Sequence, residues 1–186
     1  MRRQRMLVPH ASLPDTPDAR LAARVHEGDA VALGELYSRF APAMFGLAER
    51  LVGRGADAED VLHDVFLGLP EALRHYNEQG TLASWLKRVT ARVALNRLRS
   101  ERRRAESVGG DMPESRSCAP HPIDAMALRD AIATLPDTLR TVFVLKEVEG
   151  FSHAEVAELL DISRGASEVR LHRAIRSLRT ILGSAR

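Results

Sequence analysis

Residues 152–182 carry the pattern that most restricts how this chain can fold, because two apolar stripes with helical spacing are separated only by a short interruption. Ser152 and Glu155 have the spacing of a capping box, in which a hydroxyl and a carboxylate satisfy free amides at the start of a helix. Residues 161–163 then break the apolar pattern, and Ser163 is suited to cap the next helix. The sequence therefore predicts a helix, a tight turn and a second helix.

The second of these helices is predicted to be amphipathic and basic. Its apolar stripe consists of Leu171, Ala174, Ile175, Leu178 and Leu182. The basic side chains lie mostly off that stripe and are Arg164, His172, Arg173, Arg176 and Arg179. Two helices joined by a short turn, with positive charge on the second, suit insertion into a DNA major groove about 12 Å wide. The pattern predicts a DNA-binding helix-turn-helix; the alternative is a helix pair whose arginines are merely solvated.

Composition favours an all-α protein, because aromatic residues make up only 4% of the 186 residues and β-branched runs are scarce. The net charge is only +2, but the charges are segregated along the chain. Residues 57–78 hold six acids and one arginine, whereas residues 87–104 hold eight bases and one acid. Neighbouring blocks of opposite charge indicate two different partners; the alternative is that both are solvated helix faces.

We predict two small helical domains joined by a flexible linker, with the helix-turn-helix in the C-terminal domain. Residues 1–17 are basic and contain three prolines, which is typical of a disordered leader. Residues 18–104 form the first domain. Residues 105–123 contain glycines, prolines and serines without an apolar period, as linkers do. Residues 124–186 form the second domain.

Helical spacing also predicts the elements within each domain. They are two helices within 18–51 separated by a turn at Gly28 and Asp29, a helix at 57–74, a helix from 82 into the arginine run, and helices at 123–134 and 138–148. Proline removes a helical hydrogen bond. Pro42 is therefore expected to open or kink a further helix, and Pro70 to interrupt the third helix near its end.

The sequence lacks the residues that several functional classes require. Cys118 is the only cysteine, so neither an internal disulfide nor a thiolate zinc site can form. The seven histidines are scattered, and we assign no metal and no cofactor. No apolar stretch approaches the roughly 18 residues of a membrane span, and the N-terminus has no apolar signal-peptide core. We expect a cytoplasmic protein without membrane insertion.

Three segments in this order resemble bacterial RNA polymerase sigma factors of the extracytoplasmic-function (ECF) group. They are DAEDVLHDVFLGL at 57–69, GTLASWLKRVTARVALNRLRSERRR at 80–104 and LPDTLRTVFVLKEVEGFSHAEVAELLDIS at 135–163. The resemblance covers about residues 18–104 and 124–182. It implies a protein that binds core RNA polymerase, directs it to promoter DNA and opens the duplex, without enzymatic chemistry of its own. It also makes an anti-sigma factor an expected partner.

The resemblance implies three groups of site residues. The residues implied to bind core polymerase are Asp60, His63 and Asp64, and His63 stands where the family often has Gln. Contacts with minus-ten DNA fall to Tyr76, Asn77, Thr81, Arg88, Arg92, Asn96 and Arg99. Contacts with minus-thirty-five DNA fall to Arg164, Glu168, Val169, His172, Arg173 and Arg176. Trp85 is expected in the core.

The chain departs from the family pattern at four further positions in the DNA-binding segments. Arg92 and Asn96 replace the usual Asn and Asp, which puts base preference at the minus-ten element in doubt, since phosphate contacts do not read sequence. Ser167 stands at a normally apolar buried position and is expected to bond a carbonyl one turn earlier. Glu168 replaces a lysine that would face DNA. We therefore predict an unusual upstream element, or weak upstream binding compensated elsewhere.

Three other functions compete with this interpretation. One is a one-component regulator that senses a ligand through residues 18–104 and uses the same helix-turn-helix. A second is a small helical hydrolase, for which no nucleophile and base pair, phosphate loop or metal set is visible. A third is a sigma-like protein that has lost promoter recognition, a possibility raised by the four departures.

Overall fold

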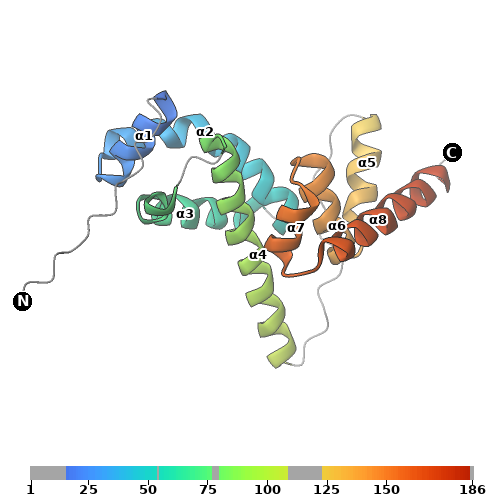
Figure 1. Cartoon of the computed structure of the whole chain (residues 1–186). Helices are drawn as coiled ribbons and strands as arrows, with labels where there is room; N and C mark the ends of the chain where they lie inside the picture. Colours follow the sequence, from blue (N-terminus) through green and yellow to red (C-terminus); the bar gives the residue numbers. More distant parts are fainter. Residues whose placement is uncertain (1–15, 54, 77–79, 109–122, 185–186) are drawn as a thin grey trace, which may run out of the picture.

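The computed structural model describes residues 16–53, 55–76, 80–108 and 123–184, and within these ranges the chain is helical and contains no strand. Its α-helices are α1 (Pro17–His26), α2 (Ala30–Val52), α3 (Gly55–Ala72), α4 (Leu82–Val108), α5 (Ile123–Ala133), α6 (Asp137–Phe143), α7 (His153–Leu160) and α8 (Arg164–Ser184). A 3-10 turn at Leu73–His75 follows α3, and a π-helical turn at Val144–Val148 follows α6. The predicted all-α class is confirmed (Figure 1).

Helices α1 to α4 form the N-terminal domain, in which α2 packs against both α3 and α4. Each helix turns an apolar face inward, and fully buried members of this core include Leu36, Met44, Leu47, Val61, Leu69 and Leu86. The predicted turn between the first two helices is present. Gly28 adopts a φ of 90°, which glycine reaches without steric cost. The carboxylate of Asp29 then caps α2 by accepting hydrogen bonds from the amides of Val31 and Ala32.

The two prolines do not divide their helices. Pro42 lies inside α2, which continues to Val52, and Pro70 lies inside α3, which continues to Ala72. The expectation that Pro42 opens a further helix is therefore wrong, whereas Pro70 lies two residues before α3 ends and the chain passes into the 3-10 turn at Leu73–His75. A proline removes one backbone hydrogen bond, but α2 buries Phe40 and Met44 on either side of Pro42, and this continuous apolar contact holds the helix together.

The C-terminal domain consists of α5 to α8 and contains the predicted helix-turn-helix. The capping box of Ser152 and Glu155 is complete at the start of α7. Asp161 ends α7 in the left-handed region with a φ of 54°, and the hydroxyl of Ser163 accepts a hydrogen bond from the amide of Ala166 at the start of α8. The apolar stripe of α8 packs inward through Leu171, Ala174 and Leu178.

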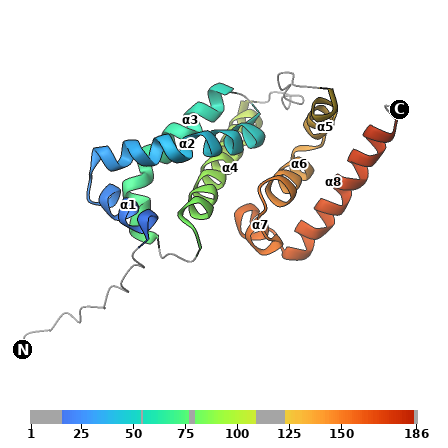
Figure 2. The same ribbon diagram turned by 90° about the horizontal axis from the view of Figure 1, so that it is seen from above.

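The two domains are in contact along α4 and α7 (Figures 1 and 2). Buried apolar residues from both domains, among them Leu95 of α4 and Val156 of α7, belong to one continuous cluster. Helix α4 extends to Val108, beyond the predicted boundary at 104, and α5 already begins at Ile123. The predicted leader up to residue 15, the middle of the predicted linker and Cys118 lie outside the described residues.

No helix within these four ranges is both long enough and apolar enough to cross a bilayer.

Candidate nucleic-acid interface

The outward face of α3 carries the residues predicted to bind core polymerase. Asp60, His63 and Asp64 are all exposed, whereas the apolar stripe of the same helix, including Val61 and Val65, is buried against α2 and α4. Helix periodicity separates these two faces, since residues three and four apart lie on the same side. The structure thus brings the three residues together on one accessible acidic surface.

Arg97 of α4 holds part of that acidic surface in place. Its guanidinium lies 2.7 Å from a carboxylate oxygen of Asp60, 3.3 Å from Asp57 and 3.4 Å from Glu101. Partial burial works to lower the pKa of Arg97, but the hydrogen bond and charge of Asp60, with the charges of Asp57 and Glu101, raise it overall. Arg97 is therefore a permanent cation that ties α3 to α4.

The loop before α4 borders a cavity of about 360 Å³ at the N-terminal end of the first domain. Its lining includes Asp18, Arg39, Tyr76, Gly80, Thr81 and Leu82. Tyr76 and Thr81, both predicted to contact minus-ten DNA, therefore border the same cavity, while Asn77 lies outside the described residues. The Thr81 hydroxyl accepts a hydrogen bond from the amide of Ser84, and Tyr76 packs on Trp85 with ring centroids 5.3 Å apart. Trp85 is half-buried against the core.

The basic face of α4 turns toward α7. Arg88 and Arg92 each reach a glutamate of α7 at 3.1 Å, and Arg99 donates a hydrogen bond to the carbonyl of Leu159 at 2.8 Å. Arg99 also donates to the side chain of Asn96 at 3.1 Å. The four residues therefore share one face, as predicted, but that face meets the C-terminal domain.

The outer face of α8 is open to solvent. Arg164, Glu168, Val169, His172, Arg173 and Arg176 are all exposed. Val169 is 51% exposed and is the apolar member of this otherwise polar face. The acid at 168 does not stand alone, because Arg164 pairs with Glu168 one helical turn away at 3.0 Å. The structure brings together all six residues predicted to contact minus-thirty-five DNA.

Ser167 is fully buried, but its hydroxyl has a different partner from the one expected. Nδ1 of His153, at the start of α7, lies 2.9 Å from the Ser167 hydroxyl oxygen. The prediction of a bond to a carbonyl one turn earlier is therefore wrong. A histidine 14 residues away supplies the contact, because the turn of the helix-turn-helix brings the N-termini of α7 and α8 close together.

Comparison with known proteins identifies two segments of this chain as members of described families. The family model described as Sigma-70 region 2 matches residues 36–104, and that described as Sigma-70, region 4 matches residues 125–178. The chain is 34% identical over 164 residues to the RNA polymerase sigma factor CarQ of Myxococcus xanthus, covering 86% of this chain and 94% of the relative. It is 28% identical over 172 residues to the ECF RNA polymerase sigma-E factor of Haemophilus influenzae, covering 84% and 90%. The chain belongs to the ECF group of RNA polymerase sigma factors.

Solved structures support the fold of this sigma factor. The sigma factor RpoE of Bartonella quintana, in complex with the anti-sigma factor NepR, aligns with a TM-score of 0.65 and 22% identity over 82% of this chain and 98% of its own. CnrH, in complex with the cytosolic domain of CnrY, aligns with a TM-score of 0.57 and 25% identity over 90% and 97%. The one-component regulator is not favoured, since both sigma-factor regions are present in order.

Several residues that shape the surfaces of α3, α4 and α8 in this ECF sigma factor could not be identified from the sequence patterns. Leu67 is 68% exposed on α3, one turn after His63 and Asp64, and adds an apolar contact point to the acidic surface. Arg97 belongs to the basic block of residues 87–104, but its side chain points to α3, where it pairs with Asp60. The sequence does contain a signal for this orientation. Arg97 is not three or four residues from Arg92 or Arg99, so it lies on a different face of the helix from them. No local pattern indicated His153 as the partner of Ser167.

Proposed function

We propose that three surfaces of this sigma factor, which directs promoter recognition, divide the work of initiation. The acidic face of α3 binds core RNA polymerase through Asp60, His63 and Asp64. The loop cavity and the basic face of α4 bind the opened minus-ten element, and the outer face of α8 reads the minus-thirty-five element in the major groove.

The observation that carries the polymerase assignment is the separation of the two faces of α3. Three polar residues stay exposed there although the helix is packed on its other side. Charged groups left accessible on a rigid helix suit a basic partner surface, because opposite charges speed encounter and select the partner. Leu67 supplies an apolar contact within the same surface.

The DNA assignments are supported by the chemistry of each surface. Aromatic and hydroxyl groups around a cavity can hold an unstacked base, while arginines hold phosphates. On α8, exposed basic residues flank Val169, whose side chain can meet a thymine methyl in the major groove. The protein would act in the cytoplasm with the polymerase, and an anti-sigma factor is included as a partner, as NepR is for the related RpoE.

The substitution Asp64→Lys tests the polymerase surface. Charge reversal at the centre of this face should weaken binding to purified core polymerase at least about tenfold, since like charges would then face each other. Glu27→Lys is the matched control, because Glu27 is an exposed acid of the same domain that lies at the end of α1 and not on α3. Equal affinities of the two variants, measured by fluorescence anisotropy, would contradict the assignment of α3.

Reconstituted run-off transcription tests the whole function. Core polymerase with the purified chain should initiate from a subset of genomic fragments and from none without the chain. Core binding without initiation from any fragment would favour the sigma-like protein with degenerate promoter recognition, for which the departures at Arg92 and Glu168 give a reason.

A further inference from the structure

A cavity of about 120 Å³ lies where α4 meets the helices of the C-terminal domain. The described residues that line it are Leu95, Leu98, Leu160, Arg99, Arg102, Arg170, Thr138 and Thr141, which include three cations and no acid. Leu95 belongs to the buried apolar cluster that runs through both domains, and Leu98 and Leu160 pack against that cluster. The three arginines therefore surround a cavity whose remaining wall is largely apolar.

Arg170 of α8 makes no hydrogen bond or ion pair within the part of the chain that the structure describes. It is half-buried and lies one helical turn from the buried Ser167 and from the buried Ala174, so it stands beside the packed side of α8. A guanidinium has five donors, and withdrawing it from water without a partner costs free energy. An anion in the cavity would supply the missing partner.

Thr141 of α6 shows the same imbalance with a neutral group. The residue is only 9% exposed, and its hydroxyl makes no hydrogen bond to any other described residue. Most buried polar side-chain groups in proteins are bonded either to protein or to ordered water. The unpaired hydroxyl and the unpaired Arg170 line the same cavity. Two donors that converge in this way suit an oxyanion, because its oxygens accept several hydrogen bonds.

The other two arginines of the cavity have partners but keep an excess of positive charge. Arg102 lies 2.8 Å from Asp137, and the same carboxylate also pairs with Arg140. Arg99 donates to the carbonyl of Leu159 at 2.8 Å, and a carbonyl carries no net charge. One carboxylate therefore serves two guanidinium groups here. A phosphoryl group carries between one and two negative charges at neutral pH and can balance this excess.

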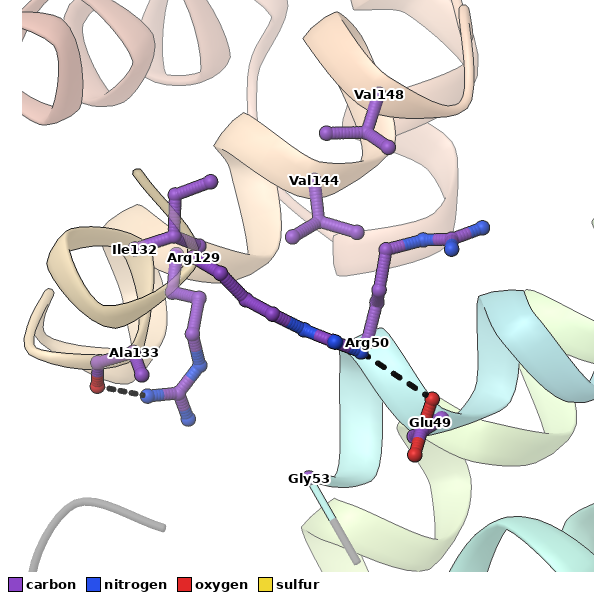
Figure 3. A pocket seen from close by; sticks show the side chains of 9 residues that line it. Glu49, Arg50, Gly53, Arg129, Ile132, Ala133, Val144 and Val148 are labelled. Carbon is purple, nitrogen blue, oxygen red and sulfur yellow. Dashed lines mark hydrogen bonds and ion pairs between the residues drawn. The ribbon is translucent and has the colours of Figure 1, made fainter. Parts of the chain in front are cut away.

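The larger cavity between the domains, of about 210 Å³, differs in this respect. Figure 3 shows Arg129 at its border beside Glu49, and the two side chains lie 3.6 Å apart. Arg50 and Arg140, which also line it, each pair with a carboxylate of the C-terminal domain. Every arginine among the described residues of that cavity thus has an acidic partner. The observations therefore favour the smaller cavity as a site for an anion.

We propose that the cavity lined by Arg170 and Thr141 binds the phosphoryl group of a small molecule, either free phosphate or the terminal phosphate of a nucleotide. Its volume equals that of roughly four water molecules in the liquid, which is enough for a tetrahedral oxyanion. The guanidinium and the hydroxyl donate to the phosphate oxygens, and Arg99 and Arg102 add positive charge. Neither Arg170 nor Thr141 belongs to the three surfaces proposed above, so the inference is independent of their roles.

Isothermal titration calorimetry of the full chain with inorganic phosphate tests the site, with sodium chloride at matched ionic strength as the blank. Phosphate should bind saturably and chloride should not. Arg170→Gln should weaken phosphate binding at least about tenfold, because it removes the charged donor that has no other partner. The matched control is Arg179→Gln, which alters an exposed arginine of the same helix outside the cavity. Absence of phosphate binding by the unaltered chain, or equal affinity of the two variants, would overturn the proposal.

Thr141→Val gives a second test, since it keeps the shape of the side chain and removes the hydroxyl. Phosphate binding should weaken about threefold or more. Stability towards urea without phosphate should not fall, because the hydroxyl has no protein partner to lose. Thr180→Val is the control, because the exposed Thr180 bonds a carbonyl of its own helix away from the cavity. Circular dichroism verifies that each variant keeps its helices. Phosphate affinity of Thr141→Val equal to that of the control would overturn the proposal.

Titrations with ATP and with a mixed-sequence DNA duplex separate the sources of the phosphoryl group. ATP that binds more tightly than phosphate, and loses affinity in Arg170→Gln, would identify a nucleotide. ATP that does not bind would identify free phosphate, and either result supports the site. The duplex should bind Arg170→Gln and Arg179→Gln alike, since each loses one charge. A loss of duplex binding in Arg170→Gln, with phosphate binding unchanged, would assign Arg170 to DNA and overturn the proposal.

Discussion

The imidazole Nδ1 of His153 lies 2.9 Å from the hydroxyl oxygen of Ser167 and joins the two helices of the helix-turn-helix at their N-terminal ends. Ser167 is fully buried, so its hydroxyl would otherwise lack a partner inside the domain. The contact therefore links α8 to α7 inside the domain, next to the apolar packing of Val156 and Leu171.

Removing this hydroxyl should destabilise the C-terminal domain. Ser167→Ala leaves the part-buried His153 without its partner and should lower the free energy of unfolding by about 1–2 kcal/mol. Denaturant unfolding measures this change. Ser177→Ala, on the same helix, is the control and should stay within about 0.5 kcal/mol of the unaltered chain. If His153→Ala adds its full effect on top of Ser167→Ala, the two side chains do not interact.

Arg97→Met should loosen the packing of α3 on α4. The change removes the cation shared by Asp57, Asp60 and Glu101, and their mutual repulsion should lower the free energy of unfolding by about 1–2 kcal/mol. Chemical denaturation monitored at Trp85 reports on this domain, since Trp85 lies on α4. Arg103→Met removes an exposed arginine of the same helix and should change stability little. Equal loss in both variants would show that Arg97 has no special structural role.

The capping box makes stability depend on pH. The hydrogen bond from the Ser152 amide lowers the pKa of Glu155 below its ordinary 4.5, against the opposing effect of burial, and the Ser152 hydroxyl and Arg88 lower it further. Because the folded pKa lies below the unfolded one, the stabilisation is complete above about pH 4.5 and is lost as pH falls through the folded value.

Glu155→Ala should therefore lower the free energy of unfolding by about 1 kcal/mol at neutral pH. The difference from the unaltered chain should shrink as the solution is acidified below about pH 4.5. Urea unfolding at several pH values measures both effects. Glu155→Gln keeps a capping side chain and should lose less at neutral pH. A gap between Glu155→Ala and the unaltered chain that is independent of pH would rule out the carboxylate as its source.

Glu168→Lys should strengthen binding to duplex DNA. The change adds a cation to the outer face of α8 and releases Arg164 from its pair, so affinity at low salt should rise about tenfold and the salt dependence should steepen. Titration of a mixed-sequence duplex at several salt concentrations measures both. Glu27→Lys makes the same charge change at an exposed site on the other domain. Unchanged affinity and sequence preference in Glu168→Lys would show that Glu168 does not face the duplex.

Much of the local structure could be predicted because its causes lie within one or two helical turns. The capping box at Ser152, the cap at Ser163 and the turn at Gly28 are all present as expected. The exposed faces of α3 and α8 also follow from helical period alone. The continuity of α2 through Pro42 could not be predicted in this way, because the burial that keeps the helix continuous depends on other helices.

The helices, their caps and the family follow from the amino-acid sequence alone, since each depends on neighbouring residues or on motifs in order. The partners of the charged and buried polar groups depend instead on the fold. Arg88 and Glu155 are 67 residues apart, and His153 and Ser167 are 14 apart. Such pairs form where packing of apolar faces brings distant segments together, and no local periodicity carries that information.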